Sequence, residues 1–464
     1  MATVPQTPID KAAEGIAIVG LSCRFAGCQD VKSYWRRILS GERAFSENDA
    51  ARRYLSRDPS QFSHLPTAWG AFLRDLWQVS PSALPSGGAQ TLSPEHALAC
   101  ELVQQALKDA PDSVRAVRHD RVGLVVGMAS QMDTASANWF QLGIGIDQTI
   151  ETLRSCFPHG TTEQFESIRA SLAASLPRYD SRTAQSLLSH AMLPVLAGRF
   201  DINGPAYAVN SGSTSSHIAI ISAAGDLACG RADLAVVCGV RGAVTPQYMM
   251  PYARLGVLSK SDAMHPYGRD ADGVLLGEGG GALVMRRLSD AIRDGDRIYA
   301  VFRSGASAAG GAKNGVGLSA SLKAACGDIQ ASSIELVEGE GAAIAQEDRD
   351  EVRALSAAWG ADARQGSAAL GSSTGIIGHT GPSSGMAGVV KAALAIHNRV
   401  IPPSQEASSP GGQLKLGETP FYLNMAPRPW IHDDLGSPRR AAVCALTREG
   451  FGAAILLEQA ARIR

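Results

Sequence analysis

Short apolar runs separated by longer amphipathic segments form the main pattern along this chain. Between the runs lie segments whose apolar residues recur at helical spacing, such as Pro94–Asp109 and Ser216–Ala228. Buried strands that alternate with helices predict a layered α/β body. The clearest strand-like runs are Ile16–Val19, Val122–Val126, Leu234–Val237, Ala282–Met285 and Ala454–Leu457.

Many of the 49 glycines lie at turns between these segments, as in Gly277–Gly281 (GEGGG). Glycine at such positions permits a tight turn or the close approach of another backbone. Two longer segments, Trp69–Gln90 and Met132–Asp180, are polar and irregular. We expect both to lie on the surface, at a subunit interface.

Composition narrows the class of protein. With 464 residues, 45% hydrophobic and 19% charged, the chain can bury a large core as one body or as two closely packed halves. A formal net charge of −1 provides no broad basic field for nucleic acid. The sequence has no run of 18 or more apolar residues and no basic N-terminus followed by an apolar stretch. We therefore expect a cytoplasmic protein that binds neither nucleic acid nor a membrane.

The eight cysteines are scattered, without a CxxC pair or the Cys/His spacing of a zinc site. In a reducing compartment we expect free thiols, most of them buried as small hydrophobic residues. The sequence thus predicts no metal site.

The first segment with candidate chemistry is Tyr207–Ile221 (YAVNSGSTSSHIAII), where small hydroxylated residues lead from an extended stretch into a helix. This order can present Ser213 at a helix N-terminus, where free amides and the helix dipole favour a developing anion. Serine and threonine before an apolar helix are more often simple N-caps. The segment alone leaves both interpretations open.

Two further segments place titratable side chains in glycine-rich loops. In Gly371–Lys391, His379 lies in a loop, and Lys391 lies well into the next helix, where a solvated charge is the usual outcome. In Ile334–Glu351, Glu340 follows an apolar run at a turn. Histidines and carboxylates in such loops are more often structural than catalytic, so neither segment decides the function alone.

Taken in order, these segments resemble the β-ketoacyl synthase domains of polyketide synthases, within the thiolase superfamily. The resemblance begins at Ile16–Phe25 (IAIVGLSCRF) and is strongest at Leu258–Asp290 (LSKSDAMHPYGRDADGVLLGEGGGALVMRRLSD). It continues to Thr419–Asn424 (TPFYLN) with Trp430, and so covers nearly the whole chain.

This resemblance implies an α/β thiolase fold, with two similar halves packed as a five-layer αβαβα body. We expect a single discrete domain over residues 1–464, with an N-terminal half at about 14–288 and a C-terminal half at about 289–460. It also implies a homodimer, or a heterodimer with an active ketosynthase, and an acyl carrier protein supplied by another chain. No cofactor is expected, because the substrate is carried on the phosphopantetheine of a carrier protein or of coenzyme A.

The chain departs from the family at the motifs that carry its chemistry. Ser213 stands where the family's D-T-A-C-S-S-S motif has the nucleophilic cysteine. Thr374 replaces the first lysine of K-S-N-I-G-H, while His379 keeps its histidine and Lys391 keeps a second lysine one helix later. LTREGFG replaces the F-G-F-G-G-T-N loop and puts Arg448 at the phenylalanine gate.

The other catalytic histidine of the family, in E-A-H-G-T-G-T, admits two alignments. We choose the one that aligns Val337–Glu340 with V-E-A-H, because it also keeps Asp348 and Glu351 on the family's G-D-x-x-E without a gap. Glu340 then replaces that histidine.

The family's geometry brings these positions together, so we expect Ser213, His379 and Glu340 to converge as nucleophile, general base and orienting carboxylate. The backbone amides of Ser213 and Arg448 are the expected oxyanion hole. Lys391 and Asn210 are expected to support the site.

The resulting hypothesis is an acyltransferase of polyketide or related secondary metabolism. It takes an acyl group from a carrier-protein or coenzyme A thioester onto Ser213, and it does not perform decarboxylative condensation. Water as the acceptor would make it a thioester hydrolase. The alternatives are a non-catalytic partner resembling a chain-length factor and a decarboxylase resembling the family's loading domains.

Overall fold

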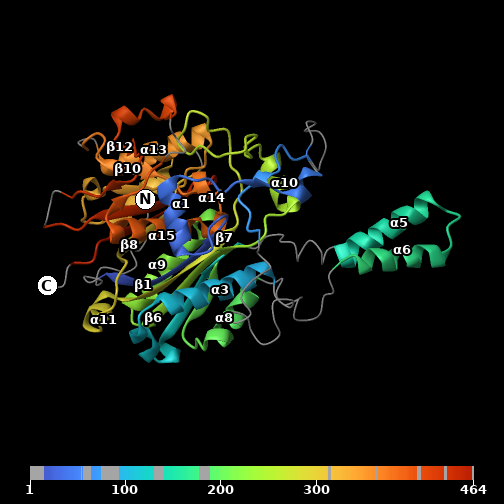
Figure 1. Cartoon of the computed structure of the whole chain (residues 1–464), viewed down its shortest axis with the longest axis horizontal. Coiled ribbons are helices and arrows are strands. Elements are labelled where there is room, and N and C mark those ends of the chain that lie inside the picture. The colour runs from blue at the N-terminus through green and yellow to red at the C-terminus, as the bar shows by residue number, and fades with distance from the viewer. Residues whose placement is uncertain are drawn as a thin grey trace.

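Figure 1 shows the computed structural model of the chain. The structure describes residues 15–53, 55, 64–74, 93–129, 141–176, 189–311, 315–360, 363–404, 409–432 and 436–461.

Eleven strands of the described residues form one mixed sheet, in the order β12-β10-β9-β14-β15-β8-β1-β7-β6-β4-β5. Their bounds are β1 (Ile16–Phe25), β4 (Val122–Gly127), β5 (Ala206–Val209), β6 (Leu234–Arg241), β7 (Gly279–Arg287), β8 (Ala300–Ala309), β9 (Leu336–Glu338), β10 (Ala368–Gly371), β12 (Phe421–Leu423), β14 (Arg440–Leu446) and β15 (Phe451–Glu458).

The sheet contains the same strand pattern twice. In the first set, β7 lies antiparallel to β1 and β6, and β4 lies parallel to β6 and β5. In the second set, β15 lies antiparallel to β8 and β14, and β9 lies parallel to β14 and β10. Pairing of Ile16–Ile18 in β1 with Ala300–Phe302 in β8 joins the sets. The layered α/β body predicted from the sequence is confirmed.

Two helices form the middle layer: α9 (Ser215–Ala228) and α15 (Ser384–Asn398) pack on each other and on strands of both sets. Residues Gly385–Ile396 of α15 are all buried, because a helix packed between the two strand sets has no face left for water. In Figure 1 this layer lies between α3 and α8 below and α13 above.

The outer helices cover the far faces of the two strand sets. Helix α3 (Pro94–Asp109) packs on β1 and β7, and α8 (Met192–Phe200) packs on α3. Helix α12 (Val316–Cys326) packs on β8 and β15, and α13 (Ala345–Trp359) packs on α12. The other α-helices in the described part of the chain are α1 (Val31–Ser40), α2 (Asp49–Arg52), α5 (Ile146–Cys156), α6 (Thr162–Ala174), α10 (Pro246–Arg254), α11 (Leu288–Arg293) and α14 (Thr374–Ile377).

The local predictions agree with this architecture at most points. All five strand-like runs lie in strands, namely β1, β4, β6, β7 and β15, and the two helical segments are α3 and α9. Trp69–Gln90 was predicted to lie on the surface, and this prediction is wrong for residues 69–74, the part of the segment that the structure describes. Ala71 and Leu73 are buried, because Ala71 bridges to Gly277 and the Leu73 amide donates to Glu278 Oε2 at 2.7 Å. Residues 75–90 of this segment lie outside the described ones.

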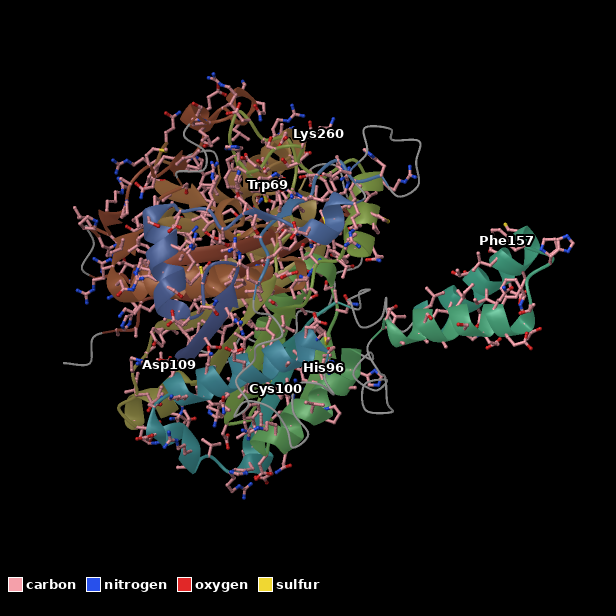
Figure 2. All side chains as sticks on the ribbon, turned by 45° about the vertical axis from the view of Figure 1, so that its right-hand side comes forward. Trp69, His96, Cys100, Asp109, Phe157 and Lys260 are labelled. Carbon is pink, nitrogen blue, oxygen red and sulfur yellow. The ribbon has the colours of Figure 1, made fainter. Side chains whose placement is uncertain are left out.

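Within the other predicted surface segment, α5 and α6 form a hairpin that stands apart from the body (Figure 1). Its small core consists of Ile146, Ile150 and Phe165. Figure 2 shows Phe157 at the outer end of this hairpin, where 62% of the residue is exposed. The surface placement is confirmed for residues 141–176, and the subunit interface stays a prediction.

All eight cysteines are free, and six of them are buried, as predicted. None of the described helices is long and apolar enough to cross a membrane.

Candidate active site

Ser213 lies in η7 (Gly212–Thr214), a 3-10 turn between β5 and α9. The neighbouring Ser215 closes this turn, since its Oγ accepts the Ser211 amide at 2.9 Å and donates to the Gly212 carbonyl at 2.7 Å. The Ser213 hydroxyl itself caps neither η7 nor α9 and hydrogen-bonds to no described residue. The N-cap interpretation is therefore wrong for Ser213, which is partly exposed.

His379 follows α14, and hydrogen bonds along its backbone hold it in place. Its amide donates to the Leu275 carbonyl at 2.8 Å, and its carbonyl accepts from the Gly277 amide at 3.0 Å. The ring Nε2 lies 2.8 Å from Glu340 Oε1, and both side chains are largely buried. The other ring nitrogen, Nδ1, is buried and has no hydrogen-bond partner among the described residues.

Glu340 lies in the loop between β9 and α13, and two buried carboxyl groups of α13 shape this loop. Glu351 accepts the amides of Glu340 and Gly341 at 2.7 and 3.1 Å. Asp348 accepts the Ala343 amide at 3.1 Å. The acidic pair that decided the alignment therefore holds the loop that presents Glu340.

Ser213, His379 and Glu340 line one cavity of about 430 Å³. The predicted convergence of these three residues is thus present, with the His379–Glu340 contact made and no hydrogen bond from Ser213 to the ring. Arg448 borders the same cavity from the turn between β14 and β15, where the Gly450 amide donates to the Thr447 carbonyl at 2.9 Å.

The Arg448 side chain is half exposed and lies 3.6 Å from Glu347 Oε1. Ser213 occupies the second position of its 3-10 turn. The first backbone amides of such a turn have no hydrogen-bond acceptor within the turn, so the Ser213 amide is not used by the turn itself.

Comparison with known protein families shows to which family the chain belongs. Residues 13–291 match the N-terminal domain of β-ketoacyl synthases, and residues 297–408 match the C-terminal domain. This chain belongs to the β-ketoacyl synthase family.

Relatives of this chain include proteins of polyketide synthases. It is 30% identical to the spectinabilin polyketide synthase system protein NorA' of Streptomyces orinoci, over 99% of this chain and 12% of that protein. It is 28% identical to a phenolphthiocerol/phthiocerol polyketide synthase protein of Mycobacterium tuberculosis, over 97% of this chain and 28% of that protein. The chain therefore spans less than a third of the length of either relative.

Solved structures show the same thiolase fold. The oxazolomycin ketosynthase domain OzmH KS7 of Streptomyces albus JA3453 has a TM-score of 0.79 at 24% identity, over 97% of this chain and 75% of that one. The ketosynthase from module 6 of the bacillaene synthase of Bacillus subtilis 168, as a C167S mutant, has a TM-score of 0.76 at 24% identity, over 97% and 73%. The fold expected from the resemblance is confirmed.

Three other residues singled out in the sequence analysis do not border the cavity. Lys391 forms a buried ion pair with Glu338, at 2.6 Å between Nζ and Oε2, so its interpretation as a solvated charge is wrong. Thr374 is buried and donates through Oγ1 to the Gly341 carbonyl at 2.7 Å. Asn210 is exposed at the end of β5.

Behind Gly381, which borders the cavity, lies a buried cation that the sequence analysis missed. Arg241, at the end of β6, is 2% exposed, and its guanidinium lies 3.8 Å from the ring centroid of Tyr248. A Cβ atom at Gly381, which borders the cavity, would lie 2.6 Å from Arg241 Nη1. Gly381 also has a φ of +54°, which favours glycine there. An arginine directly after the apolar residues of β6 was the signal in the sequence.

The Lys391–Glu338 pair predicts a specific pattern of stability. Lys391→Met leaves a buried carboxylate unpaired, and such losses cost about 3–5 kcal/mol. The double variant Lys391→Met/Glu338→Gln removes both charges and should recover most of this loss, as measured by chemical denaturation. Equal destabilisation of the single and double variants would contradict the prediction.

The buried carboxyls of α13 predict a pH effect. Burial raises the pKa of Asp348 to about 7 and that of Glu351 to about 8. Between the ordinary carboxyl pKa near ~4 and these values, the folded state holds more protons than the unfolded state. Unfolding free energy should therefore fall, by on the order of a few kcal/mol, as pH rises from 5 to 8.5.

Unfolding midpoints in urea, measured across this pH range, test the effect. Asp348→Asn and Glu351→Gln keep an acceptor for the loop amides but cannot ionise, so each variant should show a flatter profile than the natural protein. Unchanged slopes would show that these carboxyls are already ionised at pH 5.

Proposed function

We propose that this protein is a ketosynthase-like acyltransferase that carries its acyl group on Ser213 and does not perform decarboxylative condensation. One observation carries the proposal: the His379 ring lies 2.8 Å from Glu340 in a cavity that Ser213 also lines. A serine, a histidine and a carboxylate are the three groups of a serine acyl-transfer site.

The proposed substitutions follow from the alignment with the family. Ser213 takes the place of the nucleophilic cysteine, and Glu340 takes the place of one catalytic histidine. A serine hydroxyl is not ionised near neutral pH, so it attacks a thioester only with the help of a base. His379 is that base in the proposal.

The contact with Glu340 assigns the roles of the two ring nitrogens. Neutral His379 donates its Nε2–H to the carboxylate, which leaves the lone pair of Nδ1 for the hydroxyl proton. Ser213 Oγ attacks the thioester carbonyl carbon as its proton passes to Nδ1. The carbon–sulfur bond then breaks, and the thiol leaves with that proton.

The second half of the proposed reaction reverses these steps. An acceptor attacks the Ser213 ester while His379 takes its proton, and the proton returns to Oγ as the ester bond breaks. The amides of Ser213 and Arg448 form the proposed oxyanion hole for both tetrahedral intermediates.

The proposed reactants are thioesters of an acyl carrier protein or of coenzyme A, and the proposed assembly is a homodimer with C2 symmetry. Membership in the β-ketoacyl synthase family and likeness to parts of polyketide synthases support both.

A second candidate is a non-catalytic partner of an active ketosynthase. The observation in its favour is that the Ser213 hydroxyl makes no hydrogen bond to His379. Such a protein would co-purify with a ketosynthase and would not become acylated.

Intact-protein mass spectrometry after incubation with acyl thioesters tests the catalytic proposal. The natural protein should gain the mass of one acyl group, and Ser213→Ala should gain none. Ser211→Ala is the matched control, because Ser211 lines the same cavity and should leave the acylated form unchanged. A gain of equal size on Ser213→Ala would rule out Ser213 as the nucleophile.

Variants of His379 and Glu340 test whether these two residues take part in acylation. His379→Ala and Glu340→Gln should slow acylation by on the order of 100-fold or more, because the hydroxyl loses its base or the base loses its carboxylate. Acylation at the natural rate in both variants would contradict the assigned roles.

A further inference from the structure

Glu340 borders a second cavity, which is much smaller than the first. Its volume is about 10 Å³, and its lining includes His217, Glu338 and Ser384 besides Glu340. A cavity needs about 10–15 Å³ and several polar partners to hold one water molecule. This cavity meets both conditions.

His217 is the unexplained residue of this cavity. It lies in the first turn of α9, four residues after Ser213 along the chain. The residue is 2% exposed, and neither ring nitrogen has a hydrogen-bond partner among the described residues. Leaving a buried polar group unsatisfied costs about 1–3 kcal/mol, so a partner is expected.

Contact with α15 places the His217 ring. A Cβ atom at Gly385 would lie 2.6 Å from His217 Nδ1, so only glycine at 385 lets the ring come this close to the helix. The imidazole is therefore held between α9 and α15, in the middle layer of the fold.

Glu340 has a matching unsatisfied atom. Its Oε1 faces His379, whereas Oε2 is buried and has no hydrogen-bond partner in the described part of the chain. The unpartnered carboxylate oxygen and the unpartnered imidazole belong to residues that line the same small polar cavity.

We propose that His217 is a positioning residue for Glu340. A water molecule in the small cavity accepts the N–H of the His217 ring and donates to Glu340 Oε2, which holds Oε1 toward His379. The effect of this contact on catalysis rests on the proposed acyl transfer, whereas the contact itself is independent of that proposal.

The charges around His217 suit this role. Burial lowers its pKa to about 4, so the ring is neutral at neutral pH and offers one donor and one acceptor. Glu338 beside the cavity is paired with Lys391, and burial raises the pKa of the Cys444 thiol, which keeps it protonated. A neutral ring orients Glu340 without adding a charge that competes with His379.

Crystal structures of the natural protein and of His217→Leu test the contact directly. We expect a solvent peak within hydrogen-bond distance of the His217 ring and Glu340 Oε2 in the natural protein. In His217→Leu the peak should be lost and Glu340 should turn from His379. A natural structure that orders other internal waters but none here would overturn the proposal, as would an unmoved Glu340 in the leucine variant.

Acylation rates test the consequence. Displacement of a catalytic group by about 1 Å can cost on the order of 100-fold, so His217→Leu should be slower by on the order of 10- to 100-fold. His217→Gln keeps a donor and an acceptor and should restore the rate to within about 3-fold of the natural protein. Equal rates for the leucine variant and the natural protein would overturn the positioning role.

His96→Leu is the matched control for the loss of a buried imidazole. His96 lies on α3 (Figure 2), is buried with an unpartnered Nδ1, and borders neither cavity. It should lose stability without slowing acylation. If the natural protein forms no acyl-enzyme, the proposed function fails, and the crystal structures still decide whether His217 holds Glu340.

Discussion

The site depends on the contact between the first turns of α9 and α15 in the middle layer. Ser213 lies just before α9, and His379 lies shortly before α15, so packing of these helices brings both residues to one cavity. The Ser384 hydroxyl at the start of α15 donates to the Ser213 carbonyl at 3.0 Å, which ties the two helix starts together. Glycine at 385 permits the approach. Through this contact, two residues that are 166 positions apart in the sequence line one cavity.

The third residue reaches the cavity by a different route, since Glu340 lies on a loop and not on a helix. A loop holds a side chain precisely enough for catalysis only when its backbone is fixed. Here the carboxyls of Asp348 and Glu351 bind its amides, and the Ser372 hydroxyl donates to the Glu340 carbonyl at 3.0 Å. The protein thus buries two further acidic side chains to hold the loop of Glu340. Burial of ionisable groups costs free energy, and here that cost falls on the residues around the site.

The sequence predicted the elements better than the contacts. Apolar periodicity located β1, β6 and α3, because burial of one side of an element leaves a repeating pattern. It could not show that Lys391 is paired, because the partner, Glu338, comes from a strand 53 positions earlier and the two meet only in the folded chain. His217 was overlooked for the same reason, since its surroundings come from β9, α15 and β14. The convergence of Ser213, His379 and Glu340 was predicted from the family resemblance, which rests on the order of the motifs along the chain. The spacing of these residues alone could not predict it.

The two proposed substitutions are coherent in charge. A thiolate nucleophile is an anion before it reacts, so a carboxylate at position 340 would oppose its ionisation. A serine is neutral until its proton leaves, and a carboxylate beside the imidazole then stabilises the cation that forms. Glu340 therefore disfavours a cysteine site and favours a serine site through the same negative charge. The two proposed substitutions are therefore compatible with each other, because the carboxylate at position 340 suits a serine at position 213 better than a cysteine.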